Sequence, residues 1–444
     1  MKRIVALGGG ESGVGAAVLA KVKGFDTFLS DNGSIPAEGK ALLEKYGIPY
    51  EEGHHTPEKI LSADEIIKSP GIPDTAPLVS EALKAGIPVI SEIEFAGRYD
   101  RAKKICITGS NGKTTTTSLI YYMLRNAGLN VGLGGNIGKS YAYQVATEDF
   151  DIYVLELSSF QLDGMYDFKA DIAIILNITP DHLDRYDHKM QNYVRAKFRI
   201  TRNMSEKDCF IFCDDDSVTV GHINEIVLRA KMLPFSEKHE VAEGAFADDK
   251  KITVRYEGEE WSVPTEELSL KGKHNIYNSM AAAITGKIMN ITNDIIRRSL
   301  ATFENIEHRL EKVMSVRGVL YINDSKATNV NSTWYALECM NRPVIWIAGG
   351  TDKGNDYSEI EPLVREKVKA LICMGKDNRK LHDFFGPMVH TITDASSAKE
   401  AVQKAYELAS DGDVVLLSPC CASFDLFKNY EDRGRQFKAA VREL

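Results

Sequence analysis

The sequence predicts an α/β protein with parallel sheets, arranged as three successive sections. Apolar runs that end at Gly or Asp alternate with helical patterns almost throughout the 444 residues, as they do in chains of βαβ units. At roughly 150 residues per domain, a chain of this length suggests about three domains. Two of the apolar runs lead directly into a glycine-rich loop and a helical pattern, an arrangement typical of phosphate-binding α/β domains.

The composition excludes several classes of protein. The net charge of −9 and the pI near 5.7 argue against nucleic acid as a partner. Seven cysteines without a C-x-x-C pair predict neither a disulfide framework nor a cysteine metal cluster, and they favour a reducing cytoplasm. The chain starts with a strand pattern rather than a signal peptide, and no apolar run approaches the ~20 residues of a membrane span. A hydrophobic content of 43% is ample for large cores.

The expected elements divide the chain at residues 1–93, 94–305 and 306–444. In the first section the predicted strands are Arg3–Leu7, Thr27–Leu29, Glu65–Ile67 and Val89–Ile90. The second section has predicted strands at Ile152–Leu155 and Ile172–Leu176, a hairpin over Ile252–Val263 and a helix over Ile276–Met289. In the third section strand and helix patterns alternate again, and the predicted strands are Leu320–Ile322, Val344–Ile347, Ala370–Cys373 and Val414–Leu417.

The first glycine-rich loop follows the first predicted strand. It contains Gly8-x-Gly10-x-x-Gly13, and Asp31 stands about twenty residues later at a strand end. This pattern is typical of dinucleotide binding, with a pyrophosphate at the helix N-terminus and the acid on a ribose or base. Taken alone, it leaves open a nicotinamide-dependent oxidoreductase or a purely structural turn. A dehydrogenase has no use for a second phosphate loop, so a nucleotide-linked substrate is favoured here.

The second loop is the strongest chemical signal. An apolar run ends at Thr108, and a helical pattern begins after Lys113. Backbone N–H groups, a helix N-terminus and a lysine form a triphosphate cradle, and a threonine hydroxyl is suited to magnesium. Ile107 stands where the usual Walker A motif has its first Gly, so the loop is shorter. The predicted ATP-binding residues are Gly109, Ser110, Asn111, Gly112, Lys113, Thr114 and Thr115.

Three further segments of the second section carry chemically suggestive side chains. Glu156 ends an apolar strand pattern, where a P-loop fold places a magnesium ligand or a water-positioning group. His182 follows another strand and is flanked by acids, so it is a candidate metal ligand. Lys197 lies between apolar neighbours in a helical pattern, and spacing alone does not distinguish it from a solvated lysine.

Several long motifs together resemble the Mur ligases of bacterial peptidoglycan synthesis, from Gly8 to about Arg435. The shortened phosphate loop is shared with folylpolyglutamate synthetases. The motifs of the central section are Thr108–Thr114, Gly134–Gly138, Glu156–Gln161, Asn177–Asp184 and His274–Asn278. Those of the third section resemble the family members that add D-glutamate, and they are Asn323–Asn329, Gly349–Lys353 and Leu417–Asp425.

The resemblance implies a fold and an activity. The expected domains are a Rossmann-like N-terminal domain for a UDP-sugar, a central P-loop-type ATPase domain with a mixed sheet, and a Rossmann-like C-terminal domain for an amino acid. The implied reaction adds D-glutamate to UDP-N-acetylmuramoyl-L-alanine through an acyl phosphate, with ATP and two Mg²⁺ ions. A cytoplasmic monomer without nucleic-acid or membrane partners is expected. Another Mur-type or folylpolyglutamate-type ligase, an NAD-dependent oxidoreductase and a non-catalytic nucleotide-binding module are the alternatives.

The resemblance also implies residue roles. Lys113, Asn136, His182 and Lys197 would be catalytic, and the metal ligands would be Thr114, Glu156, His182 and Lys197 as a carbamate. Asn275, Arg309 and Asp324 would complete the ATP site. The UDP-substrate residues would be Gly10, Glu11, Ser12, Gly13, Asp31, Asn32, Ser69, Pro70, Gly71, Asn136, Ser158 and Gln161. The D-glutamate residues would be Lys326, Thr328, Lys353, Ser423 and Tyr430. Glu11, an anion beside a diphosphate, and Tyr430, where a plain aromatic residue is expected, depart from the family pattern.

Overall fold

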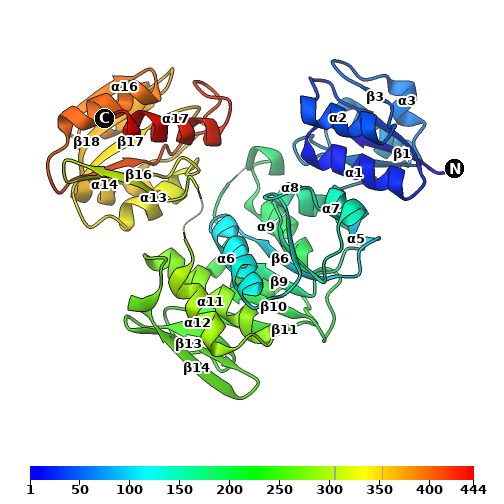
Figure 1. The fold of residues 1–444 in the computed structure, drawn as a ribbon, viewed down its shortest axis with the longest axis horizontal. Coiled ribbons are helices and arrows are strands. Elements are labelled where there is room, and N and C mark those ends of the chain that lie inside the picture. Colours follow the sequence, from blue (N-terminus) through cyan, green and yellow to red (C-terminus); the bar gives the residue numbers. More distant parts are fainter. Residues whose placement is uncertain (182, 305–306, 353) are drawn as a thin grey trace. The chain divides into compact units, whose positions relative to one another are not determined.

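The computed structural model describes residues 1–444 except 182, 305–306 and 353 (Figure 1). The chain forms two compact units. The first contains Met1–Ser269 and Asn275–Phe303, and the second contains Leu270–His274 and Glu304–Leu444. Three sheets with helices between their strands confirm the predicted α/β class. The boundary at 93/94 stays a prediction, and the boundary at 305/306 lies outside the described residues.

The first sheet has five parallel strands in the order β3-β2-β1-β4-β5. Its central strand β1 is apolar because both faces are covered, and Ile4, Val5 and Ala6 are fully buried. The elements are β1 (Arg3–Leu7), α1 (Glu11–Val22), β2 (Asp26–Ser30), α2 (Ala37–Lys45), β3 (Tyr50–Glu51), α3 (Pro57–Leu61), β4 (Glu65–Lys68), α4 (Pro77–Lys84) and β5 (Val89–Ile90). The carboxyl ends of β1, β2 and β4 form one edge, where α/β sheets bind nucleotides.

The second sheet has nine strands in the order β14-β13-β12-β11-β10-β9-β6-β8-β7. It is mixed, as expected, because β12, β13 and β14 pair antiparallel at one end while the other pairs are parallel. The strands are β6 (Lys103–Thr108), β7 (Val131–Gly135), β8 (Ile152–Glu156), β9 (Ile172–Ile175), β10 (Cys209–Cys213), β11 (Lys231–Ser236), β12 (Gly244–Ala247), β13 (Lys251–Tyr256) and β14 (Glu259–Pro264).

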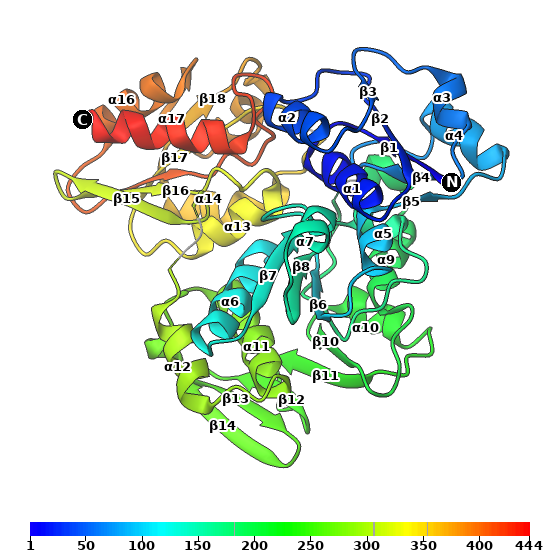
Figure 2. The ribbon, with the colours of Figure 1, turned by 45° about the vertical axis from the view of Figure 1, so that its right-hand side comes forward.

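Within the described part of the chain, eight α-helices accompany these strands, and α6, α11 and α12 are seen together in Figure 2. They are α5 (Glu92–Gly97), α6 (Lys113–Asn126), α7 (Tyr141–Thr147), α8 (Ser159–Asp163), α9 (Met190–Phe198), α10 (Ser217–Ile223), α11 (Lys273–Ile288) and α12 (Asn293–Thr302). Short 3₁₀ helices are η1 (Leu183–Tyr186), η2 (Arg199–Thr201) and η3 (Thr265–Glu267). Helix α6 packs on α12, which closes one side of the phosphate-loop helix.

The third sheet has the order β15-β16-β20-β17-β18-β19, and only β15 is antiparallel to its neighbour among these strands. The two faces of β17 enter different cores, with Trp346 on one face and Ile345 and Ile347 on the other. The elements are β15 (Glu311–Val316), β16 (Val319–Asn323), α13 (Val330–Glu338), β17 (Val344–Ala348), η4 (Ser358–Ile360), α14 (Glu361–Lys367), β18 (Val368–Met374), α15 (Arg379–Phe385), β19 (Ile392–Ala395), α16 (Ala398–Leu408), β20 (Val414–Leu417) and α17 (Tyr430–Arg442).

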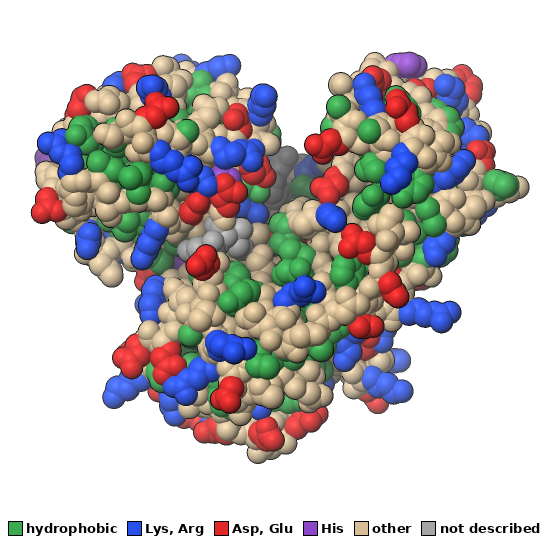
Figure 3. All heavy atoms as spheres, in the orientation of Figure 1, with side chains coloured by type: hydrophobic (Ala, Val, Ile, Leu, Met, Phe, Trp, Pro, Cys, Tyr) green, Lys and Arg blue, Asp and Glu red, His purple; other side chains and the backbone are tan. Residues whose placement is uncertain are grey.

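Acidic and basic side chains are interspersed over the face shown in Figure 3. Among the described residues, every helix is too short or too polar to cross a bilayer.

Candidate active site

The predicted phosphate loop has the expected strand–loop–helix geometry. Strand β6 ends at Thr108, and Gly112 is the N-cap residue of α6, which begins at Lys113. Lys113 Nζ donates hydrogen bonds to the carbonyl oxygens of Gly109 and Ser110, both at 2.8 Å. The ammonium therefore lies at the helix N-terminus, where N–H groups and the helix dipole attract phosphate.

A neighbouring segment holds the phosphate loop in shape. The side chain of Asn177 accepts from Asn111 N at 2.9 Å and donates to Asn111 O at 3.1 Å. Ser110 Oγ donates to the carbonyl oxygen of Thr179 at 2.8 Å. The sequence singled out this segment for His182, which lies outside the described residues. The sequence reasoning missed the hydrogen bonds that Asn177 and Thr179 of this segment form with the phosphate loop, because these bonds join residues far apart in the chain.

Helix α11 contacts the same loop through Asn278, another residue that sequence reasoning missed. Asn278 Oδ1 accepts from Thr116 Oγ1 at 3.1 Å, and Asn278 Nδ2 donates to Asn275 Oδ1 at 3.1 Å. A Cβ on Gly112 would overlap Asn278 Oδ1, so glycine is required for this close approach. The amide pair brings Asn275 beside the phosphate loop, although its role toward the adenine stays a prediction.

Glu156 and Asn136 lie together at the carboxyl end of β8. Asn136 Nδ2 donates to Glu156 Oε1 and Asn136 N to Glu156 O, each at 2.8 Å. Gly135 has a φ of 97°, and a Cβ there would collide with Glu156 O, which explains the glycine. Strand β8 is the neighbour of β6, with Glu156 opposite Ile107. The predicted metal carboxylate thus lies one strand from the phosphate loop.

The donor types at this edge fit a magnesium ion. Glu156 is 1% exposed and Thr114 is 3% exposed, and each offers an oxygen. Magnesium prefers hard oxygen ligands, and carboxylate and hydroxyl groups next to a phosphate cradle are of that kind. We therefore keep both residues as proposed ligands.

Lys197 is buried against the phosphate loop. It is 1% exposed, its Nζ donates to Gly109 O at 2.8 Å, and it lies 4.5 Å from the Tyr193 ring centroid. Gly109 O therefore accepts from both Lys113 and Lys197. Burial, and then the neighbouring charge of Lys113, hold the pKa of Lys197 well below its usual value. An ordinary solvated lysine is ruled out at this position.

Ser158 and Gln161, predicted to line the acceptor, form the capping box of α8. Ser158 N donates to Gln161 Oε1 at 2.9 Å, and Gln161 N donates to Ser158 Oγ at 3.3 Å. These bonds give both side chains a local structural role. A further role toward the acceptor stays a prediction.

The predicted UDP residues gather at the edge formed by β1, β2 and β4. Gly10 is the N-cap residue of α1, next to Glu11, Ser12 and Gly13. Asp31 accepts from Gly9 N and from Gly33 N, the latter at 2.6 Å. Ser69 Oγ is buried beside Gly8 and Gly13, and it has no hydrogen-bond partner among the described residues. The remaining predicted residues here are Asn32, which is exposed, and Pro70 and Gly71, which follow Ser69. Their contacts with the nucleotide stay predictions.

Glu11 forms a hydrogen bond to the segment that begins α7. Its Oε1 accepts from Ser140 N at 3.0 Å. Glu92, which is 2% exposed, accepts from Ser140 Oγ and from Ala142 N, the latter at 2.9 Å. Burial raises the pKa of Glu92 to about 7, because the charged form loses its hydration. Glu11 therefore connects α1 to the start of α7, and Glu92 connects α5 to the same point.

Helix α1 packs directly on α7, as both ribbon views show (Figures 1 and 2). Gly15 lies at this contact. A Cβ at this position would overlap Ser140 Oγ and would lie only 3.2 Å from Tyr143 Cβ. The predicted UDP-binding helix N-terminus is thereby fixed relative to the segment that carries Asn136.

Replacing Gly15 with alanine is expected to lower the free energy of unfolding by about 1–3 kcal/mol, because the added methyl overpacks the contact. Thermal unfolding checks this against Gly221→Ala, a control in α10 where the methyl meets open space. The control should be neutral or slightly stabilising through helix propensity. Equal unfolding temperatures for the two variants would contradict a tight contact at Gly15.

In the second unit, Asp324 lies at the end of β16 and is 6% exposed. Its carboxyl group accepts from Ser418 Oγ at 2.9 Å and from Leu310 N at 3.1 Å. Burial raises the pKa of Asp324 to about 7, although Ser418 and the charge of Arg309 oppose this. Arg309 and Asp324 are thus neighbours, and their ATP roles stay predictions.

Four of the residues predicted to bind D-glutamate also lie in this unit. Lys326 Nζ lies 5.4 Å from the Tyr430 ring centroid. Thr328 is half-buried in the same loop, and Ser423 is buried with its carbonyl accepting from Phe427 N at 3.0 Å. Lys353 lies outside the described residues.

Arg433 organises these loops and was missed by the sequence reasoning. It is fully buried on α17, and its guanidinium donates to Ser325 O at 2.8 Å and to Cys421 O at 3.2 Å. It also reaches Gly349 O at 3.4 Å. Burial lowers the pKa of Arg433 to about 10. The Arg433 side chain thus joins the three loops that carry the third-section motifs. This role was not visible in the sequence, because the three loops are far apart in the chain and meet only in the folded structure.

Comparison with known proteins identifies the family. Residues 3–77 match the MurD N-terminal domain, residues 107–286 the Mur ligase middle domain, and residues 308–421 the glutamate ligase domain of Mur ligases. The UDP-N-acetylmuramoylalanine–D-glutamate ligase of Bacteroides fragilis is 59% identical and covers all of both chains. The enzyme of the same name from Porphyromonas gingivalis is 57% identical over 99% of this chain and 98% of its own.

Solved structures show the same fold at low identity. The UDP-N-acetylmuramate-alanine ligase MurC of Thermotoga maritima superposes with a TM-score of 0.63 at 18% identity, covering 100% of this chain and 99% of its own. The MurF ligase of the same organism, solved in complex with ADP, gives 0.60 at 14% identity over 94% and 95% of the two chains. From its phosphate loop to its third-section motifs, the chain belongs to the Mur ligase family.

Proposed function

We propose that the chain is an ATP-dependent ligase that joins the amine of D-glutamate to the alanine carboxyl of UDP-N-acetylmuramoyl-L-alanine. The observation that carries this proposal is the full-length similarity to ligases of that name. The geometry supports it, because a triphosphate cradle, a buried carboxylate and a second glycine-rich nucleotide edge occur in one chain. Each of these has a use in joining a nucleotide-linked acid to an amine.

The reaction divides into two displacements. A carboxylate oxygen of the acceptor attacks the γ-phosphorus of ATP, the bond to ADP breaks, and an acyl phosphate forms. The amine of D-glutamate then attacks the acyl carbon, phosphate leaves, and the amine gives up a proton. In the first step two anions meet, and at 4 Å their repulsion is about 4 kcal/mol at an effective dielectric constant near 20. Lys113 offsets this charge at the phosphate loop.

We infer that Thr114, Glu156, His182 and a carbamate on Lys197 hold up to two magnesium ions. When bound, these ions would neutralise phosphate charge and orient the transferring group. Asn136, whose amide is held by Glu156, would position the acceptor carboxylate next to that centre. The third-section residues would bind the amino acid, since two carboxylates require a cation and hydroxyl donors.

We also propose that the chain acts on small molecules as a monomer in the cytoplasm, without nucleic-acid or membrane partners. Seven free thiols suit a reducing compartment, and the acidic net charge suits substrates bound by local cations.

An assay with separate amino acids tests the function. Phosphate release is followed with ATP, Mg²⁺ and UDP-N-acetylmuramoyl-L-alanine. We expect D-glutamate to support turnover and L-glutamate to fail. Turnover with L-glutamate and a folate acceptor would favour a folylpolyglutamate-type ligase. Cofactor reduction without ATP hydrolysis would favour an oxidoreductase.

Lys353 should determine affinity for the amino acid. Lys353→Ala is expected to raise the KM for D-glutamate at least tenfold and to leave the KM for ATP nearly unchanged, because the lost cation would pair with a substrate carboxylate. Steady-state kinetics measure both constants. Lys399→Ala, which removes a surface lysine of α16, is the control. Equal changes in both KM values would argue against a glutamate contact.

A further inference from the structure

Three metal-binding side chains converge in the second unit, next to a loop whose Lys376 N donates to Asp425 of a third-section motif at 3.0 Å. Cys373 on β18 and Asp394 on β19 are paired in register, so their side chains leave the same face of the sheet. His382 comes from α15, and its Nε2 lies 2.9 Å from Asp394 Oδ1. One ligand atom of each residue lies within 4.8 Å of the others.

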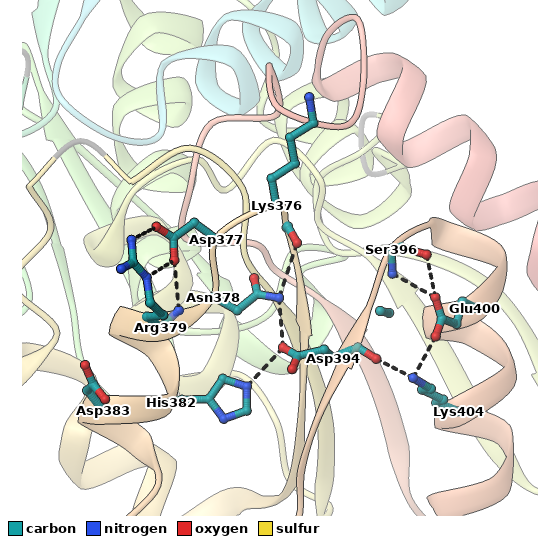
Figure 4. A pocket seen from close by; sticks show the side chains of 12 residues that line it. Lys376, Asp377, Asn378, Arg379, His382, Asp383, Asp394, Ser396, Glu400 and Lys404 are labelled. Carbon is teal, nitrogen blue, oxygen red and sulfur yellow. Dashed lines mark hydrogen bonds and ion pairs between the residues drawn. The ribbon is translucent and has the colours of Figure 1, made fainter.

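This cluster borders a solvent-connected cavity of about 850 Å³ at the carboxyl ends of β18 and β19. Figure 4 shows the imidazole of His382 directed at the carboxylate of Asp394 on one side of this cavity. Burial is graded across the cluster, with Cys373 buried, His382 half-buried and Asp394 exposed. His382 and Asp394 line the cavity, and Cys373 is the buried member of the cluster.

Neighbouring side chains hold the ligands in place without competing for the centre. Asn378 Nδ2 donates to Asp394 Oδ1 at 2.8 Å and to Cys373 O at 3.1 Å, so one amide connects both ligand residues. Two cations that line the cavity pair with acids outside the cluster, Arg379 with Asp377 and Lys404 with Glu400. Hydrogen bonds to ligand carboxylates are typical of metal sites.

A second group of metal-binding types, Glu307, His308 and Glu311, is different. The ammonium of Lys438 lies 2.5 Å from Glu307 Oε1 and 2.9 Å from Glu311 Oε1. A cation of the chain thus already occupies the position between these carboxylates. The group around Cys373 has no such ammonium at its centre among the described residues.

We propose that Cys373, His382 and Asp394 form a binding site for a zinc-type transition-metal ion. A sulfur, an imidazole nitrogen and a carboxylate oxygen are the ligands of zinc, and three protein ligands leave a fourth position for water. Thiolate does not suit magnesium, so this site is distinct in chemistry from the proposed ATP-linked metals. On binding, the Sγ–metal bond forms as the thiol proton leaves to solvent. The Nε2 proton of His382, which is directed at Asp394, also leaves to solvent while Nδ1 takes one up, so that Nε2 of the neutral imidazole binds the metal.

The site would join two adjacent strands and the helix that follows the first of them. A metal ion that binds the folded state but not the unfolded state stabilises the folded state. Zinc should therefore raise the unfolding temperature of the protein. The rise should vanish when a ligand is removed.

Cobalt titration of the full-length protein tests the proposal. The chelator-treated protein is kept in excess Mg²⁺, so that oxygen-rich sites are filled, and Co²⁺ is added. We expect one equivalent per chain, with near-ultraviolet thiolate-to-cobalt absorption that Zn²⁺ abolishes. Cys373→Ser should lose this band, whereas Cys339→Ser, at a partly exposed thiol of the same unit, should keep it.

Two variants of the less buried ligands, His382 and Asp394, test the proposal independently if Cys373→Ser does not fold. His382→Ala and Asp394→Asn should each weaken cobalt binding at least tenfold. His390→Ala, at an exposed histidine of the same unit, should leave it unchanged. The proposal is overturned if the wild-type protein shows no thiolate band, or if cobalt affinity is the same in His382→Ala and His390→Ala.

Discussion

Replacing Lys113 with alanine is expected to reduce ATP-dependent turnover by at least a hundred- to a thousandfold, on the order of the loss of one preorganised charge at a transition state. Lys113 lies at the N-terminus of α6 with its Nζ on the phosphate loop, 2.8 Å from two loop carbonyls. Its ammonium is the charge that offsets repulsion between the acceptor carboxylate and the γ-phosphate. Phosphate release measures the loss.

The fold should survive this change, because Lys113 is half-buried and its ammonium donates to backbone oxygens of the phosphate loop. Circular dichroism and the unfolding temperature check that point. Lys103→Ala removes an exposed lysine at the opposite end of β6 and should keep full activity. Near wild-type phosphate release by folded Lys113→Ala protein would contradict the proposal that this loop binds the phosphates of ATP.

Replacing Lys197 with alanine is expected to abolish most activity, and short carboxylates such as acetate should restore part of it. Lys197 is fully enclosed, and it shares Gly109 O with a second ammonium. Burial lowers its pKa, so more of the amine is neutral near physiological pH. A neutral amine can add to CO₂ and release one proton, which gives a carbamate whose oxygens suit magnesium.

Two measurements separate this role from a structural one. The first is rescue of Lys197→Ala by acetate at saturating ATP, compared with chloride at equal ionic strength. The second is a carbamate carbonyl resonance after incubation with ¹³C-bicarbonate, present in the wild type and absent in Lys197→Ala. A fully active Lys197→Ala protein would refute the role. An inactive variant that acetate does not rescue, together with no resonance, would leave only a packing role.

Elements whose pattern is local were predictable from the sequence. The strands Arg3–Leu7, Val89–Ile90 and Val414–Leu417 have the predicted bounds, because apolar runs between turn residues define them. Strand β7 was missed, since three of its five residues are glycine, which strands usually disfavour. One of those glycines, Gly135, instead allows the close approach to Glu156.

The candidate site was predictable where a strand end and a helix start define it. The phosphate loop and Glu156 stand where the pattern placed them. The supports around them were not predictable, because Asn177, Asn278 and Arg433 act through contacts between distant segments. The hydrogen bond from Ser140 N to Glu11 was not predictable either, because the two residues are 129 positions apart in the chain.

The central claim is that the acceptor carboxylate is activated by phosphorylation. It is tested most directly with UDP-N-acetylmuramoyl-L-alanine labelled with ¹⁸O in its carboxylate. Turnover with ATP and D-glutamate should transfer one ¹⁸O atom to each inorganic phosphate, because the carboxylate oxygen that attacks phosphorus leaves with it. Mass spectrometry of the released phosphate gives the result. Unlabelled phosphate alongside full amide formation would contradict the acyl-phosphate route and the ligase account built on it.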